Sequence, residues 1–515
     1  MLRPTFLGFE TAKRGIQVSQ KGLDIVGQNM TNWDSAGYTR QRLDQVAIAA
    51  STYTTRFASG RVGVAGQGVD VSGVAQVRDS FLDKRFRDEY SDEGYYGQAG
   101  TILADIESAI GEFNALNDAG IRGSLQSLLP ALQKLAGSPF SETNANIVCT
   151  EFRNLTQTLH QLDGKLSKVE EQQKFNLKTA VDQVNEKLRK VAALNYAISQ
   201  DLGLTLDNEH YGPNELYDQR NLLLDELSQF GDLQVTAHGD GTVTVQMGTM
   251  TVVDGDKYER MEYVDNAGGT VTLRWNSTGQ QVVCAGGALK GFTDFINGRG
   301  PNVTNSGETP YRGILYYRDK LNTFASTLAG VVNSSVPVYN SDGTLKDPPE
   351  FKELLGAMSS TPDADGHYEV STDIPVTAAN ISLSDLWAAS SSYIIPKAES
   401  KDNNDILQLY NNLANVRQTF VSGGQVYNGT FYDYVDDYAA TLAEDYTFYD
   451  GRHVASATIL QDLQDRRDSV SGVVLDEETA SMLMYNKSLQ AASRLMTTLD
   501  EALDVLINKT GLVGR

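Results

Sequence analysis

The chain has 515 residues, of which 40% are apolar and 21% are charged, and its formal net charge is −23. This length exceeds a single hydrophobic core and predicts about three or four domains. The acidic balance argues against a nucleic-acid partner, because contacts with phosphate groups need a basic face. The only cysteines are Cys149 and Cys284, which excludes a disulfide framework and a cysteine-rich metal cluster.

The first helical pattern begins at the amino terminus and ends near Met30. Apolar and small residues recur in it at alternating steps of three and four, which is the spacing of a coiled-coil seam. Such a helix is only marginally stable alone in water, so its seam needs a partner. The N-terminal assembly seam comprises Phe9, Ile16, Leu23, Val26 and Met30.

Turn-forming residues follow at positions 32–37, where Gly37 is available for a positive φ angle. The chain then reads as a bent, glycine-rich extended arm that reaches Val77. The spacing of its glycines does not match the dinucleotide-binding fingerprint. Helical patterning resumes after the arm and dominates as far as residue 230. We expect these helices over residues 79–112, 121–135, 142–200 and 214–230.

The composition changes at Asp232, where short apolar–polar alternations separated by glycine-rich turns predict antiparallel strands. The pattern continues to residue 300 and predicts one β domain. Beyond it the chain is helical again, apart from a loop-rich segment at residues 339–376. We expect these later helices over residues 314–333, 406–420, 431–445 and 453–470.

The last helix repeats the signal of the first, with apolar residues again at alternating steps of three and four. Two such helices at opposite ends of the chain predict pairing with each other or with copies in neighbouring molecules. The chain between them is then an insertion carried on a paired stem. The C-terminal assembly seam comprises Met482, Leu489, Met496, Leu499, Leu503 and Leu506.

These elements predict a fold that is mainly α with a β insertion, in which the terminal helices pair as a coiled-coil stem. Residues 1–78 and 471–515 are expected to form an axial core with the extended arm. Residues 79–231 and 301–470 are expected to form a discontinuous helical-bundle domain. Residues 232–300 are expected to form an outer antiparallel β domain.

Side chains with catalytic potential are scattered. None of the five histidines lies in the His-Glu-x-x-His spacing that places two zinc ligands on one helix face. The sequence also lacks a Gly-x-Ser-x-Gly nucleophile elbow and a phosphate-binding loop. We therefore predict no catalytic, cofactor-binding or metal site and no enzyme activity. An alternative is a carbohydrate-binding or enzymatic module in residues 232–300, in which Trp275 would stack on a sugar; a packing role is commoner for a tryptophan.

Three stretches, in order along the chain, carry a family resemblance. The second of them is the Asp-Gln-Arg segment at residues 214–220, just before the predicted β domain. The N-terminal signature consists of Asn29, Asn32, Gly37, Tyr38, Thr39, Arg40 and Gln41. The C-terminal motif consists of Ser471, Gly472, Val473, Leu475, Asp476, Glu477 and Glu478. Together these stretches resemble bacterial flagellar axial proteins, and within them the hook-associated protein 1 family.

The resemblance implies a structural protein that assembles as a ring at the hook–filament junction and adapts the flexible hook to the rigid filament. Its implied partners are further copies of itself, the flagellar hook protein, the second junction protein (hook-associated protein 3) and an export chaperone that covers the C-terminal helix. No nucleic acid and no membrane insertion are implied, and no cofactor.

The resemblance also changes the expected location. The first ten residues lack the apolar core of a signal peptide, and no uncharged run is long enough to cross a bilayer, which alone would predict a cytosolic protein. The family is instead exported through the flagellar type III apparatus without a cleaved signal, so an extracellular place in the flagellum is expected. An unfolded chain in a narrow channel should carry no cross-links, which fits the missing disulfides.

A flagellar rod or hook subunit is the alternative within this class. Such subunits share the features at Asn29–Asn32 and Gly37–Tyr38. The C-terminal motif argues against this alternative, because it resembles the segment that opens the final helix of the hook-associated family.

Overall fold

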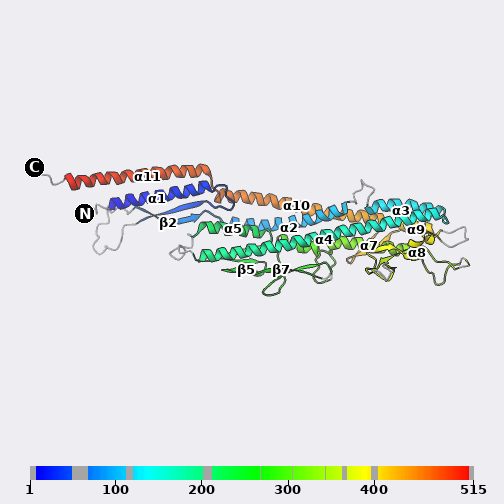
Figure 1. Cartoon of the computed structure of the whole chain (residues 1–515). Coiled ribbons are helices and arrows are strands. Elements are labelled where there is room, and N and C mark those ends of the chain that lie inside the picture. The colour runs from blue at the N-terminus through cyan, green and yellow to red at the C-terminus, as the bar shows by residue number, and fades with distance from the viewer. Residues whose placement is uncertain are drawn as a thin grey trace, which may run out of the picture. The chain divides into compact units, whose positions relative to one another are not determined.

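Figure 1 shows the computed structural model of the chain. Contacts between residues divide it into two compact units. The terminal unit comprises Met1–Tyr90, Asn185–Glu259 and Ala457–Arg515, and the middle unit comprises Ser91–Val184 and Arg260–Ser456. The structure describes residues 7–48, 68–111, 120–200, 212–266, 268–303, 305–340, 342, 344–361, 368–395 and 404–509.

Helices dominate the described residues. The α-helices are α1 (Leu7–Thr31), α2 (Ser80–Ile110), α3 (Gly120–Gly137), α4 (Glu142–Ser199), α5 (Asn214–Ser228), α6 (Ala288–Ile296), α7 (Ile314–Asn333), α8 (Asp385–Ala389), α9 (Asp405–Ala414), α10 (Phe431–Ser471) and α11 (Leu475–Asp504). A 3-10 turn lies at Ser391–Ile394, and a π turn at Val505–Lys509 follows α11.

The strands form small antiparallel sheets. They are β1 (Gln41–Ala47), β2 (Val69–Gln76), β3 (Leu233–Ala237), β4 (Val243–Met247), β5 (Met250–Asp254), β6 (Lys257–Tyr258), β7 (Met261–Asp265), β8 (Val271–Trp275), β9 (Leu355–Met358), β10 (Val370–Ser371), β11 (Ile381–Leu383), β12 (Gln418–Ser422) and β13 (Gln425–Gly429). Their orders are β1-β2, β3-β4-β5-β6, β7-β8, β10-β9-β11 and β12-β13.

In the terminal unit, α1 and α11 lie side by side and run antiparallel (Figure 1). The line of closest approach on α1 consists of glycines at intervals of seven residues. A Cβ atom built on Gly8 would lie 3.0 Å from Leu499, one on Gly15 3.3 Å from Ala492, and one on Gly22 2.6 Å from the ring of Tyr485. Each step of seven residues forward along α1 therefore matches seven residues backward along α11, the repeat of a coiled coil. Between Gly15 and Gly22, the hydroxyl of Ser19 donates to that of Ser488 at 3.1 Å.

The β1–β2 hairpin covers another side of α1. Val18 of the helix and Leu43 of the hairpin are buried, and Gly68 approaches Thr11 closely. The φ angle of +77° at Gly37, before the hairpin, confirms the conformation expected there, which side chains other than glycine rarely adopt. The arm predicted as far as Val77 is thus a hairpin in its described parts, while residues 49–67 lie outside them.

The long helix α4 owes its length to two apolar seams. Leu155, Leu159, Leu162 and Leu166 are buried, and so are Leu177, Val181, Val184, Leu188 and Val191. Between the seams the buried positions are polar. Glu170 accepts a hydrogen bond from Arg318, and Gln173 donates one to Asp105. The two seams are thus separated by a buried polar layer, in which Glu170 and Gln173 have hydrogen-bond partners.

The middle unit has an aromatic core where α7, α10 and the β12–β13 hairpin meet. Phe420 stacks on Tyr434 with ring centroids 4.1 Å apart, and Phe431 meets Phe324 and Phe420 edge to face. All four rings are buried. The aromatic residues at the start of α10 therefore pack against rings of α7 and β12 in the core.

The fold class expected from the sequence is confirmed, with helical terminal regions and a β-containing middle region. The helix predicted at 314–333 has the bounds of α7. The two helices predicted at 431–445 and 453–470 were wrong as separate elements, because α10 runs through both. Gly451, which lies between the two predicted helices, is part of α10, with nothing within 4 Å of its Cβ position.

The prediction of a helix to residue 420 was wrong beyond α9. Residues 418–422 form strand β12, which pairs with β13 across the turn at Gly423 and Gly424. Both glycines have positive φ angles, as a tight hairpin requires. Helix α6 at 288–296 lies inside the segment predicted as β domain, whose strands form two separate sheets. The division between the units falls after Glu259, within that segment, and the three-domain organisation remains a prediction.

The close approach of α1 to α11 at Gly22 generates a test. Gly22→Ala places a methyl group 2.6 Å from the ring of Tyr485, and we expect overpacking to cost about 1–3 kcal/mol of the pairing free energy. Gly27→Ala is the matched control on the same helix, because nothing lies within 4 Å of its Cβ position. Hydrogen exchange over residues 7–31 should become faster in the first variant and not in the second. Equal protection in both variants would contradict the packing described here.

Candidate assembly site between the terminal helices

The centre of the site is the side chain of Asn29 on α1, which is only 1% exposed. Its Oδ1 accepts hydrogen bonds from the hydroxyl of Tyr38 at 2.8 Å and from the backbone N–H of Gln41 at 3.0 Å. Its Nδ2 donates to the carbonyl of Gln41 at 2.9 Å and to Glu478 Oε2 at 3.2 Å. The amide thus uses both donors and both acceptor positions, which the burial of a polar group demands.

Glu478 on α11 is the second buried member, at 2% exposure. Its other oxygen, Oε1, accepts from Arg40 Nε at 2.7 Å. Arg40 extends the contact to the exposed carboxylate of Glu477 at 2.8 Å, and its backbone N–H donates to the carbonyl of Ser471 at 2.9 Å. The N-terminal signature and the C-terminal motif, which are far apart in the sequence, therefore meet in one polar cluster. We call Asn29, Tyr38, Arg40, Gln41 and Glu478 the clasp.

Burial and charge set the protonation states around the clasp. Burial, together with the nearby carboxylates of Asp218 and Glu215, raises the pKa of Tyr38 above its ordinary value. The hydroxyl therefore stays protonated and remains the donor to Asn29. Burial also raises the pKa of Asp218 to about 6, against the hydrogen bonds from Thr39 that favour its charged form.

Asp218 links the signature to α5. One of its oxygens accepts from the backbone N–H of Thr39 at 3.3 Å, and the other accepts from Gln76 Nε2 at 2.9 Å. Asn214, one turn earlier on α5, donates to the carbonyl of Val74 at 3.1 Å. Through Asn214 and Asp218, α5 thus binds Thr39, just before β1, and the end of β2.

Arg220 is the last residue of the same segment and binds α4 and the turn before β4. Its guanidinium donates to Asn195 Oδ1 at 3.1 Å and to the carbonyl of Gly241 at 2.7 Å. Asn195 in turn donates to the carbonyl of Val243, at the start of β4. Asn214, Asp218 and Arg220 of this segment therefore each have a structural partner within the terminal unit.

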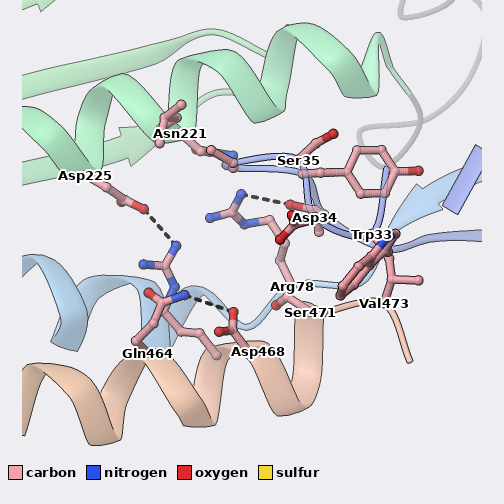
Figure 2. Close-up of a pocket in the computed structure, with 17 residues that line it drawn as sticks. Trp33, Asp34, Ser35, Arg78, Asn221, Asp225, Gln464, Asp468, Ser471 and Val473 are labelled. Atoms are coloured by element: carbon pink, nitrogen blue, oxygen red, sulfur yellow. Dashed lines mark hydrogen bonds and ion pairs between the residues drawn. The ribbon is translucent and has the colours of Figure 1, made fainter. Parts of the chain in front are cut away.

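Beside the clasp lies a cleft of about 550 Å³ between the 33–39 loop, α5 and α10 (Figure 2). Ion pairs connect charged side chains that line the cleft with charged side chains next to it. Asp225 accepts from Arg467 at 2.7 Å and from Arg87 at 2.6 Å, and Arg467 also contacts Asp83. Trp33 lies at its edge and is 58% exposed. These charged groups are thus paired with one another, as buried charges require.

The remaining members of the signature lie around this loop. Asn32 follows the end of α1, and its side-chain amide donates a hydrogen bond to the carbonyl of Gln28 in that helix at 3.0 Å. Thr39 is buried, and its hydroxyl accepts from Arg78 at 3.2 Å. In the C-terminal motif, Gly472 approaches the carbonyl of Asp468 so closely that a Cβ would lie 2.4 Å from it, as the end of α10 turns into α11. Val473 lies between α10 and α11, and Leu475 and Asp476 lie in the first turn of α11.

The predicted seams lie partly on the contact between α1 and α11. In the N-terminal seam, Val26 is buried, whereas Phe9, Ile16, Leu23 and Met30 are half-buried. The first three of these half-buried residues each follow a glycine of the contact line by one residue. In the C-terminal seam the outcome is also mixed. The half-buried members are Leu489, Met496, Leu499 and Leu503, and the exposed members are Met482 and Leu506.

Two features of the site escaped the sequence analysis. The contact line of Gly8, Gly15 and Gly22 was not predicted, although its seven-residue spacing is visible in the sequence. The pairing of Arg40 with Glu478 was also missed, since no local pattern relates residues so far apart.

Among the described residues, no group of histidine, cysteine, aspartate and glutamate side chains could hold a metal ion. None of the described helices combines the length and the apolar character needed to span a bilayer.

The clasp predicts unequal effects at two adjacent glutamates. Glu478→Ala leaves a buried amide and the guanidinium of Arg40 without their acceptor, and we expect a loss of about 2–3 kcal/mol in the pairing of α1 with α11. Glu477→Ala removes only an exposed ion pair with the same arginine and should cost less than about 1 kcal/mol. Limited proteolysis of residues 7–31 and 475–504 would report the difference. Equal resistance of the two variants would show that the clasp does not hold the helices together.

Comparisons with known proteins agree on one family. The family described as "Flagellar hook-associated protein FlgK helical domain" matches residues 104–336. Flagellar hook-associated protein 1 of Bacillus subtilis is 29% identical over 542 residues, covering 99% of this chain and 99% of that protein. The protein of the same name from Salmonella typhimurium is 24% identical, covering 96% of this chain and 98% of its own length.

A solved structure has a similar fold. It is titled "The structure of the flagellar hook junction protein FlgK from Burkholderia pseudomallei", and it aligns with a TM-score of 0.55 at 13% identity, covering 75% of this chain and all of that one. The sequence matches extend over nearly the whole chain and include both ends, where the clasp lies. The chain therefore belongs to the flagellar hook-associated protein 1 family and has a structural role in the bacterial flagellum.

Proposed function

We propose that the chain assembles as a ring at the hook–filament junction and adapts the flexible hook to the rigid filament. The observation that carries this proposal is the clasp, which joins the two ends of the chain into one antiparallel helix pair. An axial ring needs subunits whose interlocking ends adopt one defined geometry. A buried polar cluster defines one such geometry, because any other register of the two helices would leave its polar groups unpaired.

The proposal extends to location and partners. The chain would act outside the cell, in the flagellum, after export without a cleaved signal. Its neighbours would be copies of itself, the hook protein on one side and hook-associated protein 3 on the other. The wide family match and the absence of a predicted catalytic site support a mechanical role over an enzymatic module in the β segment, where Trp275 is buried in the fold.

Deletion of the gene tests the junction role against the rod-or-hook alternative. We expect normal hooks and the release of unpolymerised filament subunits into the medium, because only the adaptor is missing. Electron microscopy of hooks and measurement of secreted filament subunit provide the two readouts, and re-expression of the chain is the control. Loss of the hooks themselves would favour a rod or hook subunit.

We also propose that an export chaperone covers α11 before assembly. Leu499 lies opposite Gly8 of α1, where a Cβ atom would come within 3.0 Å of it, and Leu503 lies on the same side of the helix. A chaperone that binds this side would exclude α1 and so would prevent premature pairing, by the helix-in-groove mode.

The double variant Leu499→Asp/Leu503→Asp tests this binding mode. Two charges on the stripe would need desolvation, so chaperone binding and incorporation into flagella should both fail. Leu483→Asp is the matched control, because Leu483 is exposed and lies away from α1. Calorimetric titration of each purified variant with the chaperone gives the affinities. Near-native affinity in the double variant would place the recognition site elsewhere, most plausibly on the C-terminal motif.

A further inference from the structure

A second cleft, of about 420 Å³, lies in the middle unit beside the β12–β13 hairpin. Helices α7 and α10 supply other walls, and the segment between α6 and α7 contributes Asn302 and Arg312. The volume falls within the range of about 300–1,000 Å³ that small-molecule sites in proteins occupy. None of the residues that line this cleft belongs to the clasp, to α1 or to α11.

Ser422 on β12 contributes an unused polar atom to the cleft. The residue is only 7% exposed and, like Phe420 two residues earlier, it lies on the inner face of the strand. Its Oγ has no hydrogen-bond partner among the residues that the structure describes. A buried hydroxyl normally has a partner, so an unsatisfied one requires an explanation. Because Ser422 lines the cleft, its hydroxyl is available to a ligand there.

Lys320 on α7 adds donors to the same cleft. The residue is only 6% exposed, and its Nζ donates to Asp437 Oδ2 at 2.8 Å. The Nζ also lies 5.6 Å from the ring centroid of Tyr316 and 5.8 Å from that of Tyr434. An ammonium group carries three N–H donors. In the described part of the chain Asp437 accepts one of them, which leaves two donors for a ligand.

Aromatic rings and side-chain amides complete the lining. Tyr427 is half-buried and lies 5.6 Å, centroid to centroid, from the buried ring of Tyr434. Gln425 Oε1 accepts from the hydroxyl of Tyr316 at 3.4 Å, and the side chain of Asn302 is exposed. The cleft therefore combines ring surface with groups that donate and accept hydrogen bonds, as ligand sites do.

The charges of the cleft are balanced within the middle unit. Lys320 is paired with Asp437, and Arg312 donates to Asp445 at 3.0 Å. An anionic ligand would meet the carboxylate of Asp437 and would find each of these cations already paired, so the desolvation of its charge would not be offset. The lining therefore fits a neutral ligand that is rich in hydroxyl groups.

We propose that this cleft binds a neutral pyranose sugar. Each hydroxyl of such a sugar both donates and accepts, so one molecule can accept from Lys320, exchange a hydrogen bond with Ser422 and donate to Gln425. The C–H groups of the sugar ring are apolar and can pack on the ring of Tyr427. The site lies outside residues 232–300 and adds a binding activity to the structural role of the chain.

Titration of the full-length chain with four neutral sugars tests the proposal: glucose, galactose, mannose and N-acetylglucosamine. Saturation-transfer NMR detects the bound sugar and gives its affinity. We expect at least one of the four to bind, and glucuronate, in which a carboxylate replaces the primary alcohol of glucose, to bind more weakly than the best of them. Ser422→Ala should weaken binding about two- to tenfold, as the loss of one hydrogen bond does. It should leave the melting temperature unchanged, because the hydroxyl has no partner in the described part of the free chain.

Two further variants locate the binding. Asn302→Trp places a large ring at an exposed position of the lining and should abolish it. Asn428→Ala is the matched control, because Asn428 is exposed on the outer face of the same hairpin, and it should bind as wild type does. Thermal unfolding checks that each variant is folded, and Ser422→Ala decides the outcome if Asn302→Trp is not.

Absence of binding by all four neutral sugars would overturn the proposal. Binding that is unchanged in Ser422→Ala would also overturn it, since the sugar would then occupy another place. Glucuronate that binds as tightly as the best neutral sugar would show that the site does not select a neutral ligand.

Discussion

The terminal unit depends on the burial of one charge. The carboxylate of Glu478 is nearly inaccessible to water and is compensated by Arg40 and Asn29. A buried ion pair of this kind rarely adds stability beyond that of a well-packed apolar replacement, but breaking it is costly. The ends of the chain can therefore pair only when helix α1, the start of β1 and helix α11 are all in place. The clasp makes three distant segments interdependent.

The glycines and the clasp have complementary roles. Tyr485 lies so close to Gly22 that only glycine fits opposite it. Gly8, Gly15 and Gly22 repeat at seven residues, however, so a slip of one heptad would again set Tyr485 against a glycine. Such a slip would bring Glu478 to Gly22, which offers no donor side chain. Close packing thus allows the helices to approach, and the clasp selects one register among those that packing permits.

Much of the fold was predictable, because long amphipathic helices have strong periodic signals. Helix α7, whose bounds are those predicted, is an example. The errors arose where local composition conflicted with tertiary context. Two helices were predicted where α10 is continuous, and residues 418–420 were read as the end of a helix although they belong to strand β12, which two glycines join to β13. The site was predictable only in part, because its signature residues were recognised while their partners across the fold were not.

Disulfide formation between two serine positions tests the central claim, the single register of the terminal helices, most directly. In a chain with Cys149 and Cys284 replaced by serine, Ser19→Cys/Ser488→Cys joins positions whose hydroxyl oxygens lie 3.1 Å apart. The account predicts an intramolecular disulfide on mild oxidation, detected by mobility and mass, because a disulfide requires such proximity. Ser19→Cys/Ser481→Cys, displaced by one heptad, should form none. Equal formation in both variants, or formation only in the second, would contradict the register that the clasp is held to select.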